Sequence, residues 1–309
     1  MLRGSLLAAA LFPLLALGSG AGSLRDGRIA YVHVGDGNRF QIYTVTATGA
    51  QRQPLTSSRR YSSFEPSYAP RGKRIAFVRS FKQFDLWTMN ADGSGLKRLT
   101  STGGEDEASP SWSPDGETIA FAVEKPAAQQ GIWLLGRDGG ERRQLTTGAD
   151  DHPSWSPDGS TIAFSRAGAI WVVAASGGNP TQLTFPGMDS EGQPYFDAEP
   201  AWSPGGSRIL FVSDRGDPAE SADQLDLWTI QPDGSGIAQI THTPSRDERD
   251  AAWSPDGRRI VYSGSGAFHG ASSSQLYVRN ANGTKRRVLT HACGECAYVN
   301  AEPSWRPVP

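Results

Sequence analysis

One short motif recurs six times along the chain, and it constrains the fold more than any other feature. The motif has the form P-x-[WY]-x-P and is followed by a turn and an apolar segment. Its copies lie at residues 66–70, 110–114, 153–157, 200–204, 251–255 and 303–307, the fifth with Ala251 in place of the first Pro. The apolar segments begin at Ile29, Ile75, Ile119, Ile162, Ile209 and Ile260, which gives a repeat of 43 to 51 residues. A period of this length is typical of propeller blades and solenoid arrays.

The first and last copies are each incomplete, and together they make one unit. The apolar segment at Ile29 has no such motif before it, whereas the motif from Pro303 to Pro307 has no apolar segment after it. A linear solenoid would leave two raw ends that need capping. We therefore predict a closed ring: an all-β, six-bladed propeller in which the C-terminal strand joins the N-terminal blade.

Each repeat predicts four short antiparallel strands. For residues 151–184, the expected segments are strand one at 153–157, a turn at 156–159, strand two at 161–164, strand three at 170–173 and an outer strand at 181–184. The turn carries Pro and Gly where a type I turn favours them. Pro is tolerated only where a strand lacks a ladder partner, so we expect strand one to be innermost, with the prolines on the edge that faces a central channel.

All nine Trp fall at two positions of the repeat. They lie in expected strand one at 112, 155, 202, 253 and 305 and in expected strand three at 87, 133, 171 and 228, while Tyr43, Tyr68 and Tyr277 take equivalent positions. We expect these rings to pack one blade against the next, because a repeated aromatic buries a large area between sheets. An aromatic surface that binds sugar or peptide is the alternative.

The motifs W-S-P-D-G, I-A-F, I-W or L-W and a closing L-T resemble the TolB-type β-propeller repeat. The resemblance implies one six-bladed propeller over residues 23–309. TolB itself places an α/β domain before its propeller, and prolyl oligopeptidase relatives attach a hydrolase domain; we expect neither here. The resemblance further implies a binding or scaffold module of the cell envelope, although a fold alone does not decide a function.

Residues 1–22 have the composition of a secretory signal peptide. Arg3 supplies a positive charge, residues 6–17 are apolar, and residues 18–22 are small. The apolar stretch is too short for a membrane span. We therefore expect a periplasmic or secreted protein without a membrane span after cleavage, and an uncleaved anchor is the alternative.

The connections are expected to differ between the two faces of the ring. Those from strand one to two and from three to four are mostly tight Pro, Gly and Asp turns, whereas the others are long and varied. The long connections are expected at residues 124–130, 185–199, 214–223, 264–274 and 291–302. All five His belong to this decorated face, at positions 33, 152, 242, 269 and 291.

The residue before each motif predicts a candidate ligand site. Because strand one is innermost, these residues should surround the channel mouth: Glu65, Ser109, His152, Glu199, Asp250 and Glu302. Further carboxylates stand close behind, at Glu107, Asp150, Asp151, Asp197 and Glu248. So many converging carboxylates repel one another unless a cation, a basic side chain or water offsets them. The candidate ligand-binding residues are Glu65, Asp151, His152, Glu199, Asp250 and Glu302.

Two interpretations of this acidic ring stay open. In one, the carboxylates accept hydrogen bonds from backbone N–H groups and from Arg246 or Arg249 at a blade junction. In the other, they bind a cation or a basic peptide. Hard oxygen ligands favour calcium or magnesium over zinc, so the candidate cofactor is calcium, held by Glu65, Glu199, Asp250 and Glu302.

Cys293 and Cys296 are the only cysteines. In an exported protein such a pair predicts a disulfide. A zinc site that includes His291 is the alternative, but a fourth ligand is not evident. A haem attachment would need His where Ala297 stands.

Charge and motifs narrow the function. The net charge is −2 and basic runs are short, as at Lys285-Arg286-Arg287, which argues against a nucleic-acid partner. The G-x-S-x-G, H-E-x-x-H and P-loop motifs are absent. We expect a non-enzymatic monomer that binds a protein or peptide on the long-loop face. The alternative is a metal-dependent lyase or hydrolase that acts on a polysaccharide or lactone through the acidic ring and His152.

Overall fold

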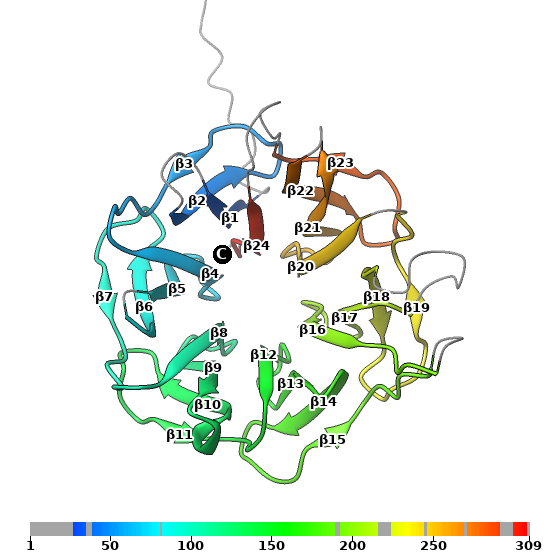
Figure 1. The fold of residues 1–309 in the computed structure, drawn as a ribbon, viewed down its shortest axis with the longest axis horizontal. Helices are drawn as coiled ribbons and strands as arrows, with labels where there is room; N and C mark the ends of the chain where they lie inside the picture. The colour runs from blue at the N-terminus through cyan, green and yellow to red at the C-terminus, as the bar shows by residue number, and fades with distance from the viewer. Residues whose placement is uncertain are drawn as a thin grey trace, which may run out of the picture.

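Six four-stranded antiparallel sheets are arranged around one axis like the blades of a propeller (Figure 1). The computed structural model describes residues 27–34, 39–80, 82–188, 192–215, 224–243, 246–268, 271–290 and 299–307. The predicted all-β, six-bladed fold is therefore confirmed. The expected signal peptide at residues 1–22 lies outside the described residues and stays a prediction.

The first three blades, from the axis outward, contain these strands. Blade 1 contains β24 (Asn300–Trp305), β1 (Arg28–Val34), β2 (Phe40–Thr46) and β3 (Gln53–Pro54). Blade 2 contains β4 (Ser62–Tyr68), β5 (Arg74–Ser80), β6 (Phe84–Asn90) and β7 (Lys97–Arg98). Blade 3 contains β8 (Asp106–Trp112), β9 (Thr118–Lys125), β10 (Gly131–Gly136) and β11 (Arg143–Gln144), with a short helix η1 (Ala127–Gln129) before β10.

The other three blades repeat the pattern. Blade 4 contains β12 (Asp150–Trp155), β13 (Thr161–Arg166), β14 (Ala169–Ala174) and β15 (Thr181–Gln182). Blade 5 contains β16 (Asp197–Trp202), β17 (Ile209–Ser213), β18 (Asp226–Ile230) and β19 (Ala238–Gln239). Blade 6 contains β20 (Asp247–Trp253), β21 (Arg259–Phe268), β22 (Ala271–Asn280) and β23 (Arg287–Val288).

The ring closes through β24, as the split repeat predicts. This C-terminal strand pairs antiparallel with β1, so that Trp305 lies opposite Ile29 and Asn300 opposite His33. Figure 1 shows β24 at the inner end of blade 1. The first blade therefore combines the two ends of the described chain.

The core lies between neighbouring blades. One cluster joins Tyr31 and Val45 of blade 1 with Val261 and Leu276 of blade 6. The indole N–H of Trp112 donates to the Ser67 carbonyl of the preceding blade at 3.2 Å, and Trp253 makes the same contact with Ala201 at 3.0 Å. The Trp residues thus lie in the predicted strands and serve contacts between blades.

The closing L-T motif ties each outer strand to strand three. The Thr hydroxyl accepts the backbone N–H of the residue on strand three, as Thr100 does from Leu86 at 2.9 Å and Thr184 from Ile170 at 2.9 Å. The same bond recurs at Thr56, Thr146, Thr241 and Thr290. The outer strands were therefore predicted too long: β15 ends at Gln182, because the next two residues turn inward and are buried.

Two other expectations about local structure are wrong. The expected loop at residues 264–274 is mostly a hairpin, because β21 and β22 stay paired up to Phe268 opposite Ala271. The repeat places the connection from strand two to strand three there, but the two strands continue their backbone pairing into it. Where the motif has two prolines, only the first lies within the inner strand. The second lies after the strand, as Pro157 does in the turn closed by Gly159 N–H and Ser156 O.

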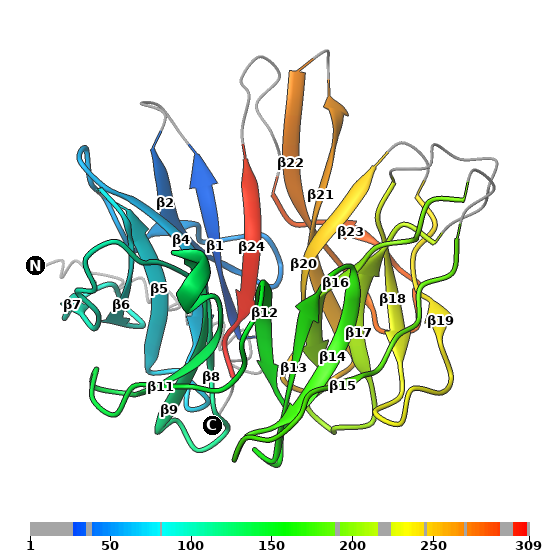
Figure 2. The same cartoon turned by 60° about the horizontal axis from the view of Figure 1, so that its bottom comes forward.

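The two faces of the ring differ. The connections from strand one to two and from strand three to four are short turns along one edge of the blades (Figure 2), and the remaining connections leave the strands at the opposite edge. The long connection after β15 ends at Phe196, since β16 already begins at Asp197. The face with the long connections is called the upper face below, and the face with the short turns the lower face.

Deletion of residues 300–309 is expected to abolish soluble expression or to lower the melting temperature by about 10 °C or more. Loss of the buried Trp305 side chain alone costs about 3–5 kcal/mol, and each kcal/mol shifts the melting temperature by roughly 2–4 °C in a chain of this size. The unpaired edge of β1 would also promote aggregation. Deletion of residues 308 and 309 alone is the control. A 300–309 deletion that melts like the control would contradict ring closure.

Candidate functional site

Each inner strand contains a β-bulge at the same place. In blade 2, Phe64 pairs with Val78 and Ser67 with Ala76, so that Glu65 and Pro66 together lie opposite Phe77. The same shift occurs in the other five blades. On strand two, the residue opposite each bulge is a fully buried aromatic. These six residues are Tyr31, Phe77, Phe121, Phe164, Phe211 and Tyr262.

The first residue of each bulge has a left-handed backbone. The φ angles are 50° at Glu65, 53° at Ser109, 52° at His152, 56° at Glu199, 53° at Asp250 and 51° at Glu302. Such a conformation costs a residue other than Gly of order 1–3 kcal/mol and persists only where its surroundings enforce it. In five blades the next residue is Pro, which has no N–H to lose from the ladder.

The six bulges surround one cavity at the axis. The cavity has a volume of about 260 Å³ and is lined by the bulge residue and the two residues after it in five blades, and by Glu199 and Pro200 in blade 5. Five of the six candidate ligand-binding residues line it, namely Glu65, His152, Glu199, Asp250 and Glu302. Asp151 does not line it but contacts His152, with its Oδ2 3.1 Å from the imidazole Nδ1.

Four carboxylates of the ring hold the backbone of the next blade. Glu199 Oε2 accepts the N–H of Asp250 at 2.6 Å, and Asp250 Oδ2 accepts the N–H of Glu302 at 3.2 Å. Glu302 Oε2 in turn accepts the N–H of Glu65, and Glu65 Oε2 accepts the N–H of Ser109 at 2.6 Å. Each acceptor belongs to the residue at the equivalent position one blade earlier. The carboxylates thus form a head-to-tail chain around most of the mouth.

Where Ser109 and His152 replace the acid, other groups complete the chain. Asp151 Oδ1 accepts the N–H of His152 at 2.7 Å and the hydroxyl of Ser109 at 2.9 Å. Ser165 Oγ accepts the N–H of Glu199 at 2.9 Å. All six left-handed residues therefore donate their N–H to a side-chain oxygen.

Burial disfavours the ionised form of these carboxyl groups and so raises their pKa values. Burial raises the pKa of Glu65 to about 7, although the Ser109 N–H and the His152 charge oppose the rise. Burial also raises the pKa of Glu302 well above its ordinary value, and the nearby carboxyls of Glu65 and Asp250 raise it further. The pKa of Glu199 is raised by burial and by Asp250.

His152 is a cation in this ring. Burial alone would lower its pKa, but the charge and hydrogen bond of Asp151, helped by Glu199 and Glu65, raise it to about 10. The imidazole is thus protonated at neutral pH and is the basic side chain that offsets the carboxylates. Because the His152 side chain is 39% exposed, the ion pair itself contributes little stability.

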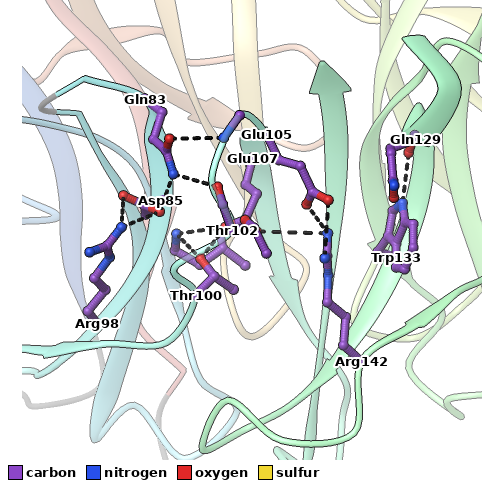
Figure 3. Close-up of polar contacts among 12 residues, drawn as sticks. Gln83, Asp85, Arg98, Thr100, Thr102, Glu105, Glu107, Gln129, Trp133 and Arg142 are labelled. Carbon is purple, nitrogen blue, oxygen red and sulfur yellow. Dashed lines mark hydrogen bonds and ion pairs between the residues drawn. The ribbon is translucent and has the colours of Figure 1, made fainter. Parts of the chain in front are cut away.

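Three of the carboxylates behind the ring, Glu107, Asp150 and Asp197, lie within 4.0 Å of an arginine. Arg166 contacts both oxygens of Asp150 at 2.5 and 2.6 Å, and Arg215 contacts both oxygens of Asp197. Arg142 pairs with Glu105, lies 3.9 Å from Glu107 and stacks over Trp133 at 4.3 Å (Figure 3). The carboxyl oxygens of Asp150 and Asp197 are thus already engaged by guanidinium groups.

The described residues contain no group of three or more His, Cys, Asp or Glu side chains arranged to hold a metal ion. Oxygens of Glu65, Glu199, Asp250 and Glu302 are instead engaged by backbone N–H groups, and Arg249 lies 3.4 Å from Glu199. Calcium binding by these residues stays a prediction. Cys293, Cys296, His269 and His291 lie outside the described residues, so the expected disulfide also stays a prediction.

An aromatic row on the upper face was not predicted from the sequence. The rings of Phe40 and Phe64 lie 4.9 Å apart, and those of Phe64 and Phe84 5.9 Å apart. Phe84 is 38% exposed, and Phe64 directly precedes Glu65 of the mouth. The available signal was an aromatic near the upper end of β2, β4 and β6, which belong to blades 1 and 2.

A second apolar area lies on the connection between blades 4 and 5. Phe185, Met188 and Phe196 are 75%, 70% and 43% exposed. The connection folds back on itself, with Tyr195 N–H donating to the Gly187 carbonyl at 2.9 Å. Single exposed apolar residues are ordinary, but grouped ones mark interaction surfaces.

Comparison with known proteins relates this fold to others. A family model described as the TolB beta propeller domain matches residues 19–196. No curated protein sequence matches the chain. Over 1,000 solved chains share the fold.

Three solved structures illustrate the range. TolB from Acinetobacter baumannii is 24% identical, with a TM-score of 0.74 over 92% of this chain and 68% of that one. A chain of a nidogen/laminin complex is 9% identical, with a TM-score of 0.67 over 89% and 98%. Oligogalacturonate lyase from Vibrio parahaemolyticus is 16% identical, with a TM-score of 0.54 over 81% and 71%. At these identities the likeness shows the fold alone.

The ring predicts an unusual dependence of stability on pH. Because the pKa of Glu65 is raised from about 4.5 to about 7, the free energy of unfolding should fall as pH rises through this window. The raised pKa of His152 adds a further loss as pH rises from about 6.5 through about 10. The double variant Glu65→Gln/Glu302→Gln should flatten the fall of melting temperature between pH 5 and 7.5. The exposed Glu141→Gln is the control, and an unchanged slope in the double variant would refute the assignment.

The chain of hydrogen bonds predicts unequal effects of two substitutions at Glu199. Glu199→Leu leaves the Asp250 N–H without an acceptor and should lower the free energy of unfolding by about 1–3 kcal/mol. Glu199→Gln keeps an acceptor oxygen and should cost much less or stabilise the protein above pH 7. Chemical denaturation at pH 7.5 measures both, and equal losses would contradict the acceptor role.

Proposed function

Because the chain belongs to the TolB beta propeller domain family, we propose that it is an exported, monomeric binding module that holds a protein or peptide partner on its upper face. The partner would cover the channel mouth and the adjoining aromatic row. No enzymatic activity is part of this proposal. The predicted signal peptide supports export, and no helix among the described residues is long and apolar enough to cross a membrane.

One observation carries the proposal: the aromatic row of Phe40, Phe64 and Phe84 includes the residue that directly precedes Glu65 of the acidic mouth. Aromatic side chains bury large areas at little cost in conformational entropy and are enriched in protein interfaces. Glu65 follows Phe64 in the chain, so a partner seated on the row also reaches the cavity. Such a surface suits a peptide with apolar side chains and a basic group.

The enzyme alternative has less support. A general base must be unprotonated at the working pH, whereas the raised pKa of His152, about 10, keeps this imidazole protonated. The carboxylates that could replace it already accept backbone N–H groups. A lyase occurs among the solved structures with this fold, but fold likeness does not carry its activity to this chain.

Affinity capture tests the proposal. The protein, purified from the periplasmic fraction, is immobilised and exposed to cell-envelope extract, and bound proteins are identified by mass spectrometry. Phe84→Ser should reduce capture of the main partner at least about tenfold, because loss of one interface anchor of 2 kcal/mol or more has this effect.

Leu96→Ser is the matched control, since Leu96 is 45% exposed and lies in a short turn of the lower face. Equal loss of capture in the two variants, or no loss in Phe84→Ser, would refute the proposed surface. Turnover of an oligosaccharide or lactone by the purified protein would favour the alternative. Light scattering of the same sample measures the molar mass and so checks whether the protein is a monomer.

A further inference from the structure

A second cavity lies on the lower face, at the interface between blades 1 and 2, which is called the closing seam below because it adjoins the β24–β1 pair that closes the ring. It has a volume of about 640 Å³. Its cationic lining residues are Arg28 at the start of β1, Lys73 in the turn before β5, and Arg306 just after β24. Asp92 is the only acidic residue among those that line it.

The guanidinium groups of Arg28 and Arg306 donate hydrogen bonds to uncharged oxygens, which hold them in place. Arg28 donates to Thr44 Oγ1 from Nε at 3.0 Å and from a terminal nitrogen at 2.9 Å, and to the Gln51 carbonyl at 2.6 Å. Arg306 Nε donates to the Gly72 carbonyl at 2.8 Å. A guanidinium has five N–H donors, so Arg306 keeps four that no described residue accepts.

None of the three cations has a carboxylate within 4.0 Å among the described residues. At the next interface, between blades 2 and 3, the equivalent arginine forms an ion pair. Arg74 takes the position of Arg28 in blade 2, and it pairs at 3.4 Å with Asp138 in a turn of blade 3. Asp92 takes the position of Asp138 in the closing seam. It accepts instead the N–H and hydroxyl of Ser94, at 2.9 and 2.7 Å.

A buried hydroxyl next to this seam also lacks a partner. The Tyr68 side chain is 6% exposed, and no described group accepts or donates a hydrogen bond to its hydroxyl. Burial raises the pKa of Tyr68 to about 12, while Arg306 and Arg28 are close enough to oppose this rise. The seam therefore contains three cationic side chains and an unpaired polar group, and its one lining carboxylate, Asp92, forms no ion pair with them within 4.0 Å.

We propose that this cavity binds an oxyanion of the phosphate type. Arg306 and Lys73 donate hydrogen bonds to its oxygens, and the positive charge of Arg28 attracts it electrostatically. Guanidinium groups pair with phosphate oxygens through two parallel N–H donors, and a half-buried site strengthens such bonds. The three cations come from the segment after the closing strand, from the first strand and from the second blade. A bound anion therefore links the parts that close the ring, on the face opposite the proposed partner surface.

Inorganic phosphate is the probe for the test. At constant ionic strength, replacing chloride by phosphate should raise the melting temperature of the full-length protein by about 2 °C or more at saturating concentration, because only the folded state binds it. Titration calorimetry should show one site per chain. Lys73→Gln, which changes an exposed side chain, should weaken phosphate binding about three- to tenfold, and Arg306→Gln more than tenfold.

Arg258→Gln is the matched control, because Arg258 takes the position of Lys73 in blade 6. Vesicles of phosphatidylglycerol and of phosphatidylcholine distinguish a free ion from a lipid headgroup. If the protein binds the phosphatidylglycerol vesicles and Lys73→Gln weakens that binding, the site takes a lipid headgroup. If the protein binds phosphate but not these vesicles, the site takes a small ion. No response to phosphate or anionic vesicles, or the same loss of binding in the Arg258 control, would overturn the proposal.

Discussion

The fold depends on six backbone N–H groups that leave the sheet ladder at the inner bulges. Each bulge places a left-handed residue next to the axis, and its N–H must find an acceptor in place of the neighbouring strand. In four blades the acceptor is the carboxylate of the preceding blade, and in the other two it is Asp151 or Ser165. The mouth is therefore acidic because the backbone requires acceptors there.

This requirement explains why so many carboxyls coexist in a small space. Raised pKa values of Glu65, Glu199 and Glu302 reduce the ring's charge at neutral pH, and His152 supplies a positive charge. The wall of the mouth is therefore hydrogen-bonded, and its raised pKa values and the His152 cation reduce its negative charge. In the proposed function the partner contacts the aromatic row of Phe40, Phe64 and Phe84, while the ring provides a fixed support.

The sequence predicted the architecture because the repeat carries it directly. Trp, Pro and Gly at constant offsets marked strands and turns, and the split repeat predicted the pairing of β24 with β1. The left-handed residues could not be foreseen, because Glu, Ser, His and Asp at one position share no backbone preference. The prediction of a loop at 264–274 was wrong for a related reason. Small residues permit both a loop and a hairpin, and pairing with the neighbouring strand decides which of the two forms.

Hydrogen exchange of the inner-strand amides tests the central claim most directly. If the side chains of the mouth hold them, the amides of Glu65, Ser109, Asp250 and Glu302 should exchange as slowly at pH 7 as those of the buried strand β5. Addition of calcium should leave these rates unchanged. Exchange at the rate of exposed turns, or protection that appears only when calcium is added, would contradict the account.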